Sequence, residues 1–97
     1  MLVLITYDVN VTNLAGKKRL RAISKTCLDY GVRVQNSVFE CEVDPANFAR
    51  LKAKLLQIYK PEADSLRFYF LGKNGYRKVE HLGAKLVADP IRDVLIL

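Results

Sequence analysis

The hydrophobic and polar positions at the start of the chain change from a strand pattern to a helix pattern. Residues 1–9 are almost continuously apolar and rich in β-branched side chains, which is typical of a buried central strand. A polar break follows, in which Thr12 or Asn13 can cap a helix. Across residues 14–30, apolar side chains recur at steps of three and four. This spacing predicts a helix with one buried face, ended by Gly31 at the C′ position.

Two strands joined by a tight turn are predicted next. Residues 32–43 are strand-like and contain no Gly or Pro, which favours a single long strand. Asn36, however, tolerates the left-handed conformation, so Asn36-Ser37 can form a two-residue hairpin loop. We predict the hairpin, with strands at 32–35 and 38–43, because two strands between the helices complete a split β-α-β arrangement.

The remainder of the chain predicts one helix and three strands. Asp44-Pro45 is a helix start, with Asp at the N-cap and Pro at the first helical position. The helix runs to about Lys60, and its buried stripe consists of Phe48, Leu51, Leu55 and Ile58. Strands are expected at 65–71, 76–82 and 94–97, with a turn at 73–75 and a break at Asp89-Pro90.

This order of elements predicts an α+β protein with a ferredoxin-like βαββαβ layout and an extra C-terminal strand. We expect residues 1–83 to form the domain, as one antiparallel sheet with two helices on one face, and residues 84–97 to form a tail. Nothing in the chain is left to cover the other face of the sheet, although that face carries apolar residues. A second copy of the chain is the expected cover, which predicts a homodimer.

Charge and length narrow the function. A chain of 97 residues has room for one small domain, and 16 Lys and Arg against 10 Asp and Glu give a net charge of +6. This excess favours an anionic partner, with nucleic acid first and an acidic membrane surface second, and the alternative is a solubilising surface. The apolar runs are too short for a membrane span or a signal peptide, so we expect a cytoplasmic protein.

Several kinds of site are excluded by composition. The sequence has two cysteines and one histidine, too few soft ligands for a zinc site, and it lacks a Gly-rich phosphate loop and a Gly-x-Ser-x-Gly motif. Cys27 and Cys41 lie among apolar neighbours, which indicates reduced core residues of a cytosolic protein. His81 has no histidine partner and is interpreted as structural. The aromatic signature of single-stranded RNA binding on a ferredoxin-like sheet is also missing.

Five segments together resemble a known family. They are Tyr7-Asp8 after the first strand, the basic helix with Lys18, Arg19 and Arg21, and the runs 31–40, 64–69 and 79–83. Through these segments the chain resembles the Cas2 family, small CRISPR-associated proteins of spacer acquisition. The resemblance covers nearly the whole chain, and residues 33–40 are its most specific part.

The resemblance implies an assembly and an activity. It implies a homodimer whose sheets face each other, with the terminal strand of each chain extending the partner's sheet. It also implies a metal-dependent endonuclease acting on RNA or double-stranded DNA. In addition, it implies a central subunit that bridges the integrase dimers of the CRISPR adaptation complex, with duplex DNA lying across it. A non-catalytic scaffold that only binds duplex DNA is the alternative function.

Asp8 is the catalytic and metal-binding candidate. In the resembled family this position supplies one carboxylate per protomer near the dimer axis, so two Asp8 side chains would share Mg²⁺ or Mn²⁺. Such an ion would lower the pKa of a bound water and stabilise charge on the phosphate. The alternative interpretation is that Asp8 caps the following loop or helix, as Asp commonly does after a strand.

The remaining candidates are basic or lie beside the hairpin. The nucleic-acid-binding candidates are Lys18, Arg19, Arg21, Lys25 and Arg33. The helical ones would bind phosphates or form a solvated face, and Arg33 would bind phosphate or tie down the dimer. Tyr7 and Phe39 are expected to be packing residues, with the site edge as the role that the family allows. Ser37 is expected to be a turn residue first and a polar site contact second.

Overall fold

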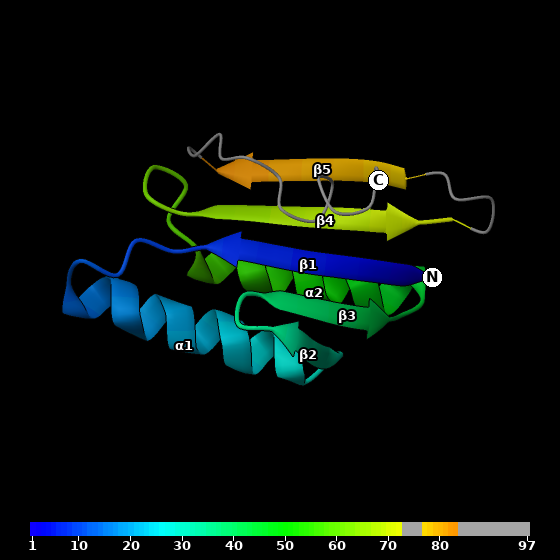
Figure 1. Ribbon diagram of the computed structural model, residues 1–97, viewed down its shortest axis with the longest axis horizontal. Helices are drawn as coiled ribbons and strands as arrows, with labels where there is room; N and C mark the ends of the chain where they lie inside the picture. The colour runs from blue at the N-terminus through cyan, green and yellow to red at the C-terminus, as the bar shows by residue number, and fades with distance from the viewer. Residues whose placement is uncertain (73–76, 84–97) are drawn as a thin grey trace.

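The computed structural model describes residues 1–72 and 77–83 and confirms the predicted α+β, ferredoxin-like fold. The elements are β1 (Leu2–Asp8), α1 (Leu14–Leu28), β2 (Val32–Gln35), β3 (Val38–Glu42), α2 (Pro45–Ile58), β4 (Ser65–Leu71) and β5 (Arg77–Gly83). The strands form one antiparallel sheet in the order β2-β3-β1-β4-β5, and Figure 1 shows both helices on one face of it. The predicted turn at 73–75 and the predicted tail and strand in 84–97 lie outside the described residues.

β1 is the central strand, and its alternating residues separate the two faces of the sheet. It pairs with β3 on one side and β4 on the other. Val3, Ile5 and Tyr7 are buried in the core that the sheet shares with the helices. Leu4 and Asp8 therefore lie on the opposite face, where both are half-buried.

Both predicted helix starts are confirmed. The Asn13 side chain accepts a hydrogen bond from the Gly16 N–H at 2.8 Å, which caps α1. At α2, Asp44 accepts from the Asn47 N–H at 2.7 Å, and Pro45 occupies the first turn, where no intrahelical donor is lost.

The core lies between the sheet and the predicted helix stripes. Ile23 and Cys27 of α1 and Leu51 and Leu55 of α2 are fully buried. Phe48 packs edge-on against two strand residues of β4, with ring centroids 5.5 Å from Phe68 and 5.2 Å from Phe70. The helical period in the sequence therefore identified the buried faces of both helices.

The two cysteines are buried and free, as the sequence predicts. Burial raises the pKa of the Cys27 thiol to about 12 and also raises the pKa of Cys41. Both thiols therefore stay protonated at neutral pH, and they act as small apolar core groups.

The role predicted for Gly31 is wrong. α1 ends at Leu28, and among the described residues a positive φ occurs only at Gly83, so Gly31 is not a left-handed C′ residue. Glycine is needed at position 31 for space, because a Cβ there would lie 2.3 Å from the Glu40 carbonyl oxygen and 2.5 Å from the Cys41 Sγ. The close approach of β3 therefore explains this glycine.

The hairpin is confirmed, but not by the predicted mechanism. Residues 36 and 37 form the turn between β2 and β3, yet Asn36 does not adopt a positive φ. The register instead shifts between Arg33 and Gln35 in β2, so a bulge lies next to the turn. A bulge increases the local twist of a strand, and here it accompanies a turn without a left-handed residue.

No described helix or strand lies over the sheet face opposite α1 and α2. On this face Leu4 is half-buried, and Val32 and Val79 are 67% and 40% exposed. The predicted homodimer would cover these side chains, and it stays a prediction for this chain. Among the described helices, none is long and apolar enough to cross a membrane.

We expect Leu51→Ala to lower the free energy of unfolding by about 3–5 kcal/mol, because it leaves a cavity in the core. The matched control on the same helix is Leu56→Ala, whose side chain is 39% exposed and whose loss should cost less than about 1 kcal/mol. Urea unfolding of both variants measures the difference. Equal losses would contradict the assignment of the buried face of α2.

Candidate functional site

Asp8 is the last residue of β1, at the carboxyl end of the central strand. It pairs in register with Ser65, the first residue of β4. The pairing of β1 with β4 ends there, and the chain continues into the loop that leads to α1. Asp8 is half-buried, and its side chain lies on the face opposite the helices, so the residue is in part accessible to solvent or to a partner.

Tyr7 and the hairpin candidates gather on the helix side of the sheet. The Tyr7 hydroxyl is hydrogen-bonded to Ser24 Oγ at 2.7 Å and donates to the Asn36 carbonyl at 3.3 Å. Its ring stacks on Phe39, with centroids 6.0 Å apart. The Tyr7 N–H also donates to the Ser37 carbonyl at 3.2 Å, so the turn is fixed to the end of β1.

Tyr7 and its contacts lie on the helix side of the sheet, whereas Asp8 lies on the opposite face. Burial raises the pKa of the Tyr7 hydroxyl, which therefore stays protonated at neutral pH. Arg33 lies over the Phe39 ring, with its Cζ 5.2 Å from the centroid, in a cation–π contact on an otherwise exposed side chain. Tyr7 and Phe39 thus have the packing role that the sequence predicts, and a role at the site edge stays a prediction.

Three predicted cations form a stripe along α1. Lys18, Arg21 and Lys25 are exposed and recur at steps of three and four. This spacing places them on one outward face of the helix. We call these three residues the α1 stripe. It is a surface of positive charge that a phosphate backbone can reach.

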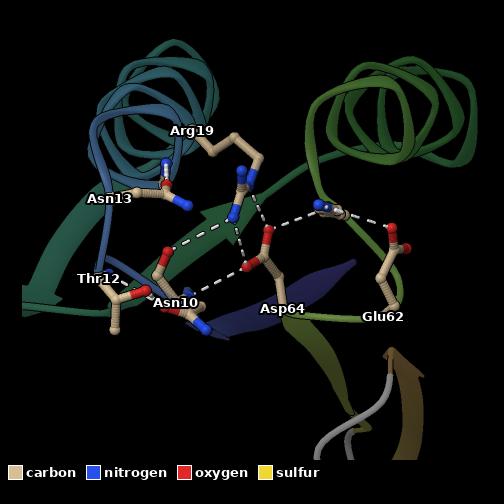
Figure 2. A network of polar contacts seen from close by, with 8 residues as sticks. Asn10, Thr12, Asn13, Arg19, Glu62 and Asp64 are labelled. Carbon is tan, nitrogen blue, oxygen red and sulfur yellow. Dashed lines mark hydrogen bonds and ion pairs between the residues drawn. The ribbon is translucent and has the colours of Figure 1, made fainter.

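Arg19 differs from the α1 stripe because its side chain turns inward. The side chain is 17% exposed, and its Nε donates to Asp64 Oδ2 at 2.8 Å. Its Nη2 donates to Asp64 Oδ1 at 3.3 Å and to the Asn10 carbonyl at 3.4 Å. Figure 2 shows the guanidinium of α1 meeting the carboxylate that precedes β4. From the sequence, Arg19 was grouped with the exposed cations. Its predicted contact with nucleic acid stays a prediction.

Asp64 is fully buried and bonded on both of its oxygens. Besides Arg19, it accepts from the Asn10 N–H at 3.0 Å and from the Lys60 N–H at 2.9 Å (Figure 2). Burial by itself would raise the pKa of this carboxyl. The hydrogen bonds from Arg19 and from the two backbone groups outweigh burial and lower the pKa of Asp64.

Sequence reasoning assigned no role to Asp64. Asp64 and Arg19 are 45 positions apart in the chain. A local pattern therefore does not connect them, and the resemblance that included Asp64 did not give it a function.

Further cations on α2 were also missed. Residues 45–58 contain three basic and no acidic side chains. Lys52 is paired with Glu80, but Arg50 and Lys54 are exposed. Alanines and leucines lie between these cations, so the sequence pattern indicated a helix that only packs against the sheet.

Asp8 offers limited coordination for a metal ion. Among the described residues, no three or more His, Cys, Asp or Glu side chains come together in a way that could hold one. Mg²⁺ usually keeps several waters and is held by one or two carboxylates. A half-exposed carboxylate at a strand end fits this kind of weak, hydrated binding, and a second Asp8 from a partner copy would complete the pair.

The family of the chain follows from comparison with known proteins. The family described as CRISPR associated protein Cas2 matches residues 1–79. The chain belongs to the Cas2 family. This confirms the resemblance that the motifs predicted.

Curated and solved members of the Cas2 family match most of the chain. The CRISPR-associated endoribonuclease Cas2 of Chlorobaculum tepidum is 59% identical over 97 residues, the full length of both chains. The CRISPR-associated endonuclease Cas2 of Halalkalibacterium halodurans is 54% identical over 96 residues, 99% of each chain. The crystal structure of Streptococcus pyogenes Cas2 at pH 6.5 has 61% identity and a TM-score of 0.71, covering 76% of this chain and 89% of that one.

The names of these Cas2 relatives identify a CRISPR-associated nuclease, so the predicted class of enzyme is confirmed. Their names differ between endoribonuclease and endonuclease. The choice of RNA or DNA, the metal ion, the assembly partners and the cytoplasmic location stay predictions for this chain.

The lowered pKa of Asp64 predicts a loss of stability in acid. Its folded pKa lies below the ordinary value of about 4, so the unfolded chain takes up the proton first as the pH falls. The stabilisation from Asp64 is therefore complete above about pH 5 and declines below pH 4. We expect Asp64→Asn to cost roughly 3 kcal/mol at pH 7 and progressively less below pH 4.

Urea unfolding between pH 3 and pH 7 measures this difference. The matched control is Glu62→Gln in the same loop, because Glu62 is exposed and only 3.8 Å from the Lys60 Nζ in a weak ion pair. A constant difference between wild type and Asp64→Asn over the whole pH range would contradict the assignment.

Proposed function

We propose that this chain is a metal-dependent endonuclease that hydrolyses phosphodiester bonds in RNA or double-stranded DNA, and that it works as a homodimer. The observation that carries the proposal is the position of Asp8. It is a half-buried carboxylate at the carboxyl end of the central strand, on the sheet face away from the helices. The names of the curated relatives support the same activity.

The apolar side chains on that sheet face support a dimer. Val32 and Val79 are 67% and 40% exposed in the single chain, and a second sheet would bury both. In a face-to-face dimer the two Asp8 carboxylates would lie on the same covered face. One carboxylate from each copy is the ligand set that the resemblance to the Cas2 family implies.

Asp8 is the residue that would hold Mg²⁺ or Mn²⁺. Such an ion, when bound, supplies positive charge to the phosphate and lowers the pKa of a water. The role of the protein's own residues is to attract and orient the nucleic acid. The α1 stripe, on the helix side of the sheet, would attract the phosphate backbone over about 10 Å at moderate salt. Asp8, on the opposite face, is where the scissile phosphate would be cut.

We expect Asp8→Asn to reduce cleavage in Mg²⁺ or Mn²⁺ by at least about 100-fold, because the substitution removes the charge that holds the ion. The dimer should remain intact, as judged by sedimentation. The matched control is Glu40→Gln, an exposed carboxylate on the same sheet face, which should cleave like wild type. Equal cleavage by Asp8→Asn and wild type, on matched RNA and DNA substrates, would remove Asp8 from the reaction.

A second candidate function is favoured by the α1 stripe. A dimer would carry two such stripes and could hold duplex DNA without cutting it. This scaffold would bridge the integrase subunits of the CRISPR adaptation complex. It would bind duplex equally well with Asp8→Asn, so the same variant separates the two functions. The terminal strand predicted to dock the partner, at 94–97, lies outside the described residues.

Replacing Lys18, Arg21 and Lys25 together with Gln should weaken duplex binding and flatten its dependence on salt. Each lost phosphate contact reduces the slope of log K against log salt by about 0.9. We therefore expect a reduction of up to about 3 for each subunit in contact, measured by fluorescence anisotropy between 50 and 200 mM KCl.

The matched control removes the same charge elsewhere. Gln at Arg50, Lys54 and Lys60 leaves the α1 stripe intact, and all three side chains are exposed. This variant should keep most of the slope. Equal reductions in both triple variants would show that only net charge matters, contrary to the assignment of the α1 stripe.

A further inference from the structure

We propose that Arg19 and Asp64 are positioning residues that hold the chain segment directly after Asp8, and that Arg19 is not a contact to nucleic acid. The inference rests on the proposed endonuclease function. It departs from the sequence-based expectation that Arg19 binds phosphate together with its helical neighbours.

The first argument is that two of the three guanidinium nitrogens of Arg19, Nε and Nη2, are used inside the protein. Two of its nitrogens bind the two oxygens of Asp64, at 2.8 and 3.3 Å, and one also binds the Asn10 carbonyl at 3.4 Å. The side chain is 17% exposed, in contrast to the exposed Lys18 and Arg21 beside it. A phosphate that took the place of Asp64 on Nε and Nη2 would leave a fully buried carboxylate without its cation, which is strongly unfavourable.

The second argument is that the pair holds residue 10 at both of its backbone groups. The Asn10 N–H donates to Asp64 Oδ1 at 3.0 Å, and the Asn10 carbonyl accepts from Arg19. The Asn10 side chain in turn accepts from the N–H and the hydroxyl of Thr12, at 3.0 and 2.7 Å. Figure 2 shows these contacts converging on the loop between β1 and α1.

A glycine makes this approach of α1 to the loop possible. A Cβ on Gly16 would lie 1.8 Å from the Asn10 carbonyl oxygen and 2.9 Å from its carbon. The first turn of α1 therefore contacts the same carbonyl group that Arg19 binds. The loop is thus held by α1 from two directions.

The third argument is the position of the Arg19–Asp64 pair relative to Asp8. The last paired residues of β1 and β4 are Asp8 and Ser65. Asp64 directly precedes Ser65, and Asn10 lies two residues after Asp8. Their 3.0 Å hydrogen bond therefore continues the connection between the two strands beyond the last pair.

Strand ends open locally more readily than strand centres. The hydrogen bonds of Arg19 and Asp64 to Asn10 hold the strand end that carries the proposed catalytic carboxylate. A displacement of about 1 Å in a reacting group can cost about 100-fold in rate. Holding the Asp8 segment is therefore expected to affect the rate of cleavage more than the binding of substrate.

The test compares Arg19→Lys with Arg21→Gln. Lysine keeps the charge at position 19 but not the two-point fit to a carboxylate. We expect Arg19→Lys to lower kcat at least about 10-fold, with KM for a duplex or RNA substrate within about twofold of wild type. Arg21→Gln should instead raise KM and reduce the salt slope of binding by about 0.9. Urea unfolding beforehand sets a temperature at which each variant is more than about 95% folded.

A second measurement does not depend on activity. Amide hydrogen exchange at Asn10 and Lys60, the two backbone donors to Asp64, should become at least about 10-fold faster in Arg19→Lys and in Asp64→Asn. Exchange at Ile5, in the centre of β1, should stay as in wild type. A uniform increase that includes Ile5 would show a general loss of stability and would overturn the positioning role.

The outcomes separate this inference from the proposed function. Arg19→Gln, which removes the charge as Arg21→Gln does, is measured beside these variants. If it reduces the salt slope and raises KM as Arg21→Gln does, with kcat unchanged, Arg19 is a phosphate contact and the inference is wrong. Unchanged kcat and unchanged Asn10 exchange would also overturn it. Cleavage that survives Asp8→Asn contradicts the proposed function instead, and the salt slope and amide exchange then still decide the role of Arg19.

Discussion

The buried carboxylate of Asp64 connects four parts of the fold that are distant in sequence. It receives hydrogen bonds from α1, from the loop after β1 and from the segment after α2, and it directly precedes β4. An isolated buried carboxylate is strongly unfavourable, so this charge is tolerated only where all these partners are in place. Correct packing of both helices at this end of the sheet is therefore required to bury it.

This constraint lies at the end of the sheet where the candidate chemistry is located. Asp8 and Ser65 close the pairing of β1 with β4, and Asp64 and Asn10 bond just beyond it. The helix side of the same region is filled by Tyr7 stacked on Phe39. The helix side of the sheet is thus packed at this strand end, and Asp8 lies half-buried on the opposite face.

The sheet divides the molecule into two surfaces with different chemistry. The helix side carries the α1 stripe, which suits a phosphate backbone. The opposite face carries the exposed Val32 and Val79, which suit a second protein surface, and Asp8, which suits a cation. A dimer that covers this second face would leave the basic helices outside.

Sequence alone determined the helix caps and the buried stripes, because each depends on residues within a few positions of one another. The order of elements also needed the overall layout, since the hairpin was predicted because it completes a split β-α-β arrangement. Asp44-Pro45 and the spacing of Leu51 and Leu55 are examples of such local signals. Tertiary structure decided what depends on distant partners. Gly31 is explained by the approach of β3, the hairpin uses a bulge in place of a left-handed Asn36, and Arg19 turns inward to Asp64. Helical spacing gives the direction in which a side chain leaves the helix. Only the packed fold shows whether that side chain meets a buried charge, as Arg19 meets Asp64.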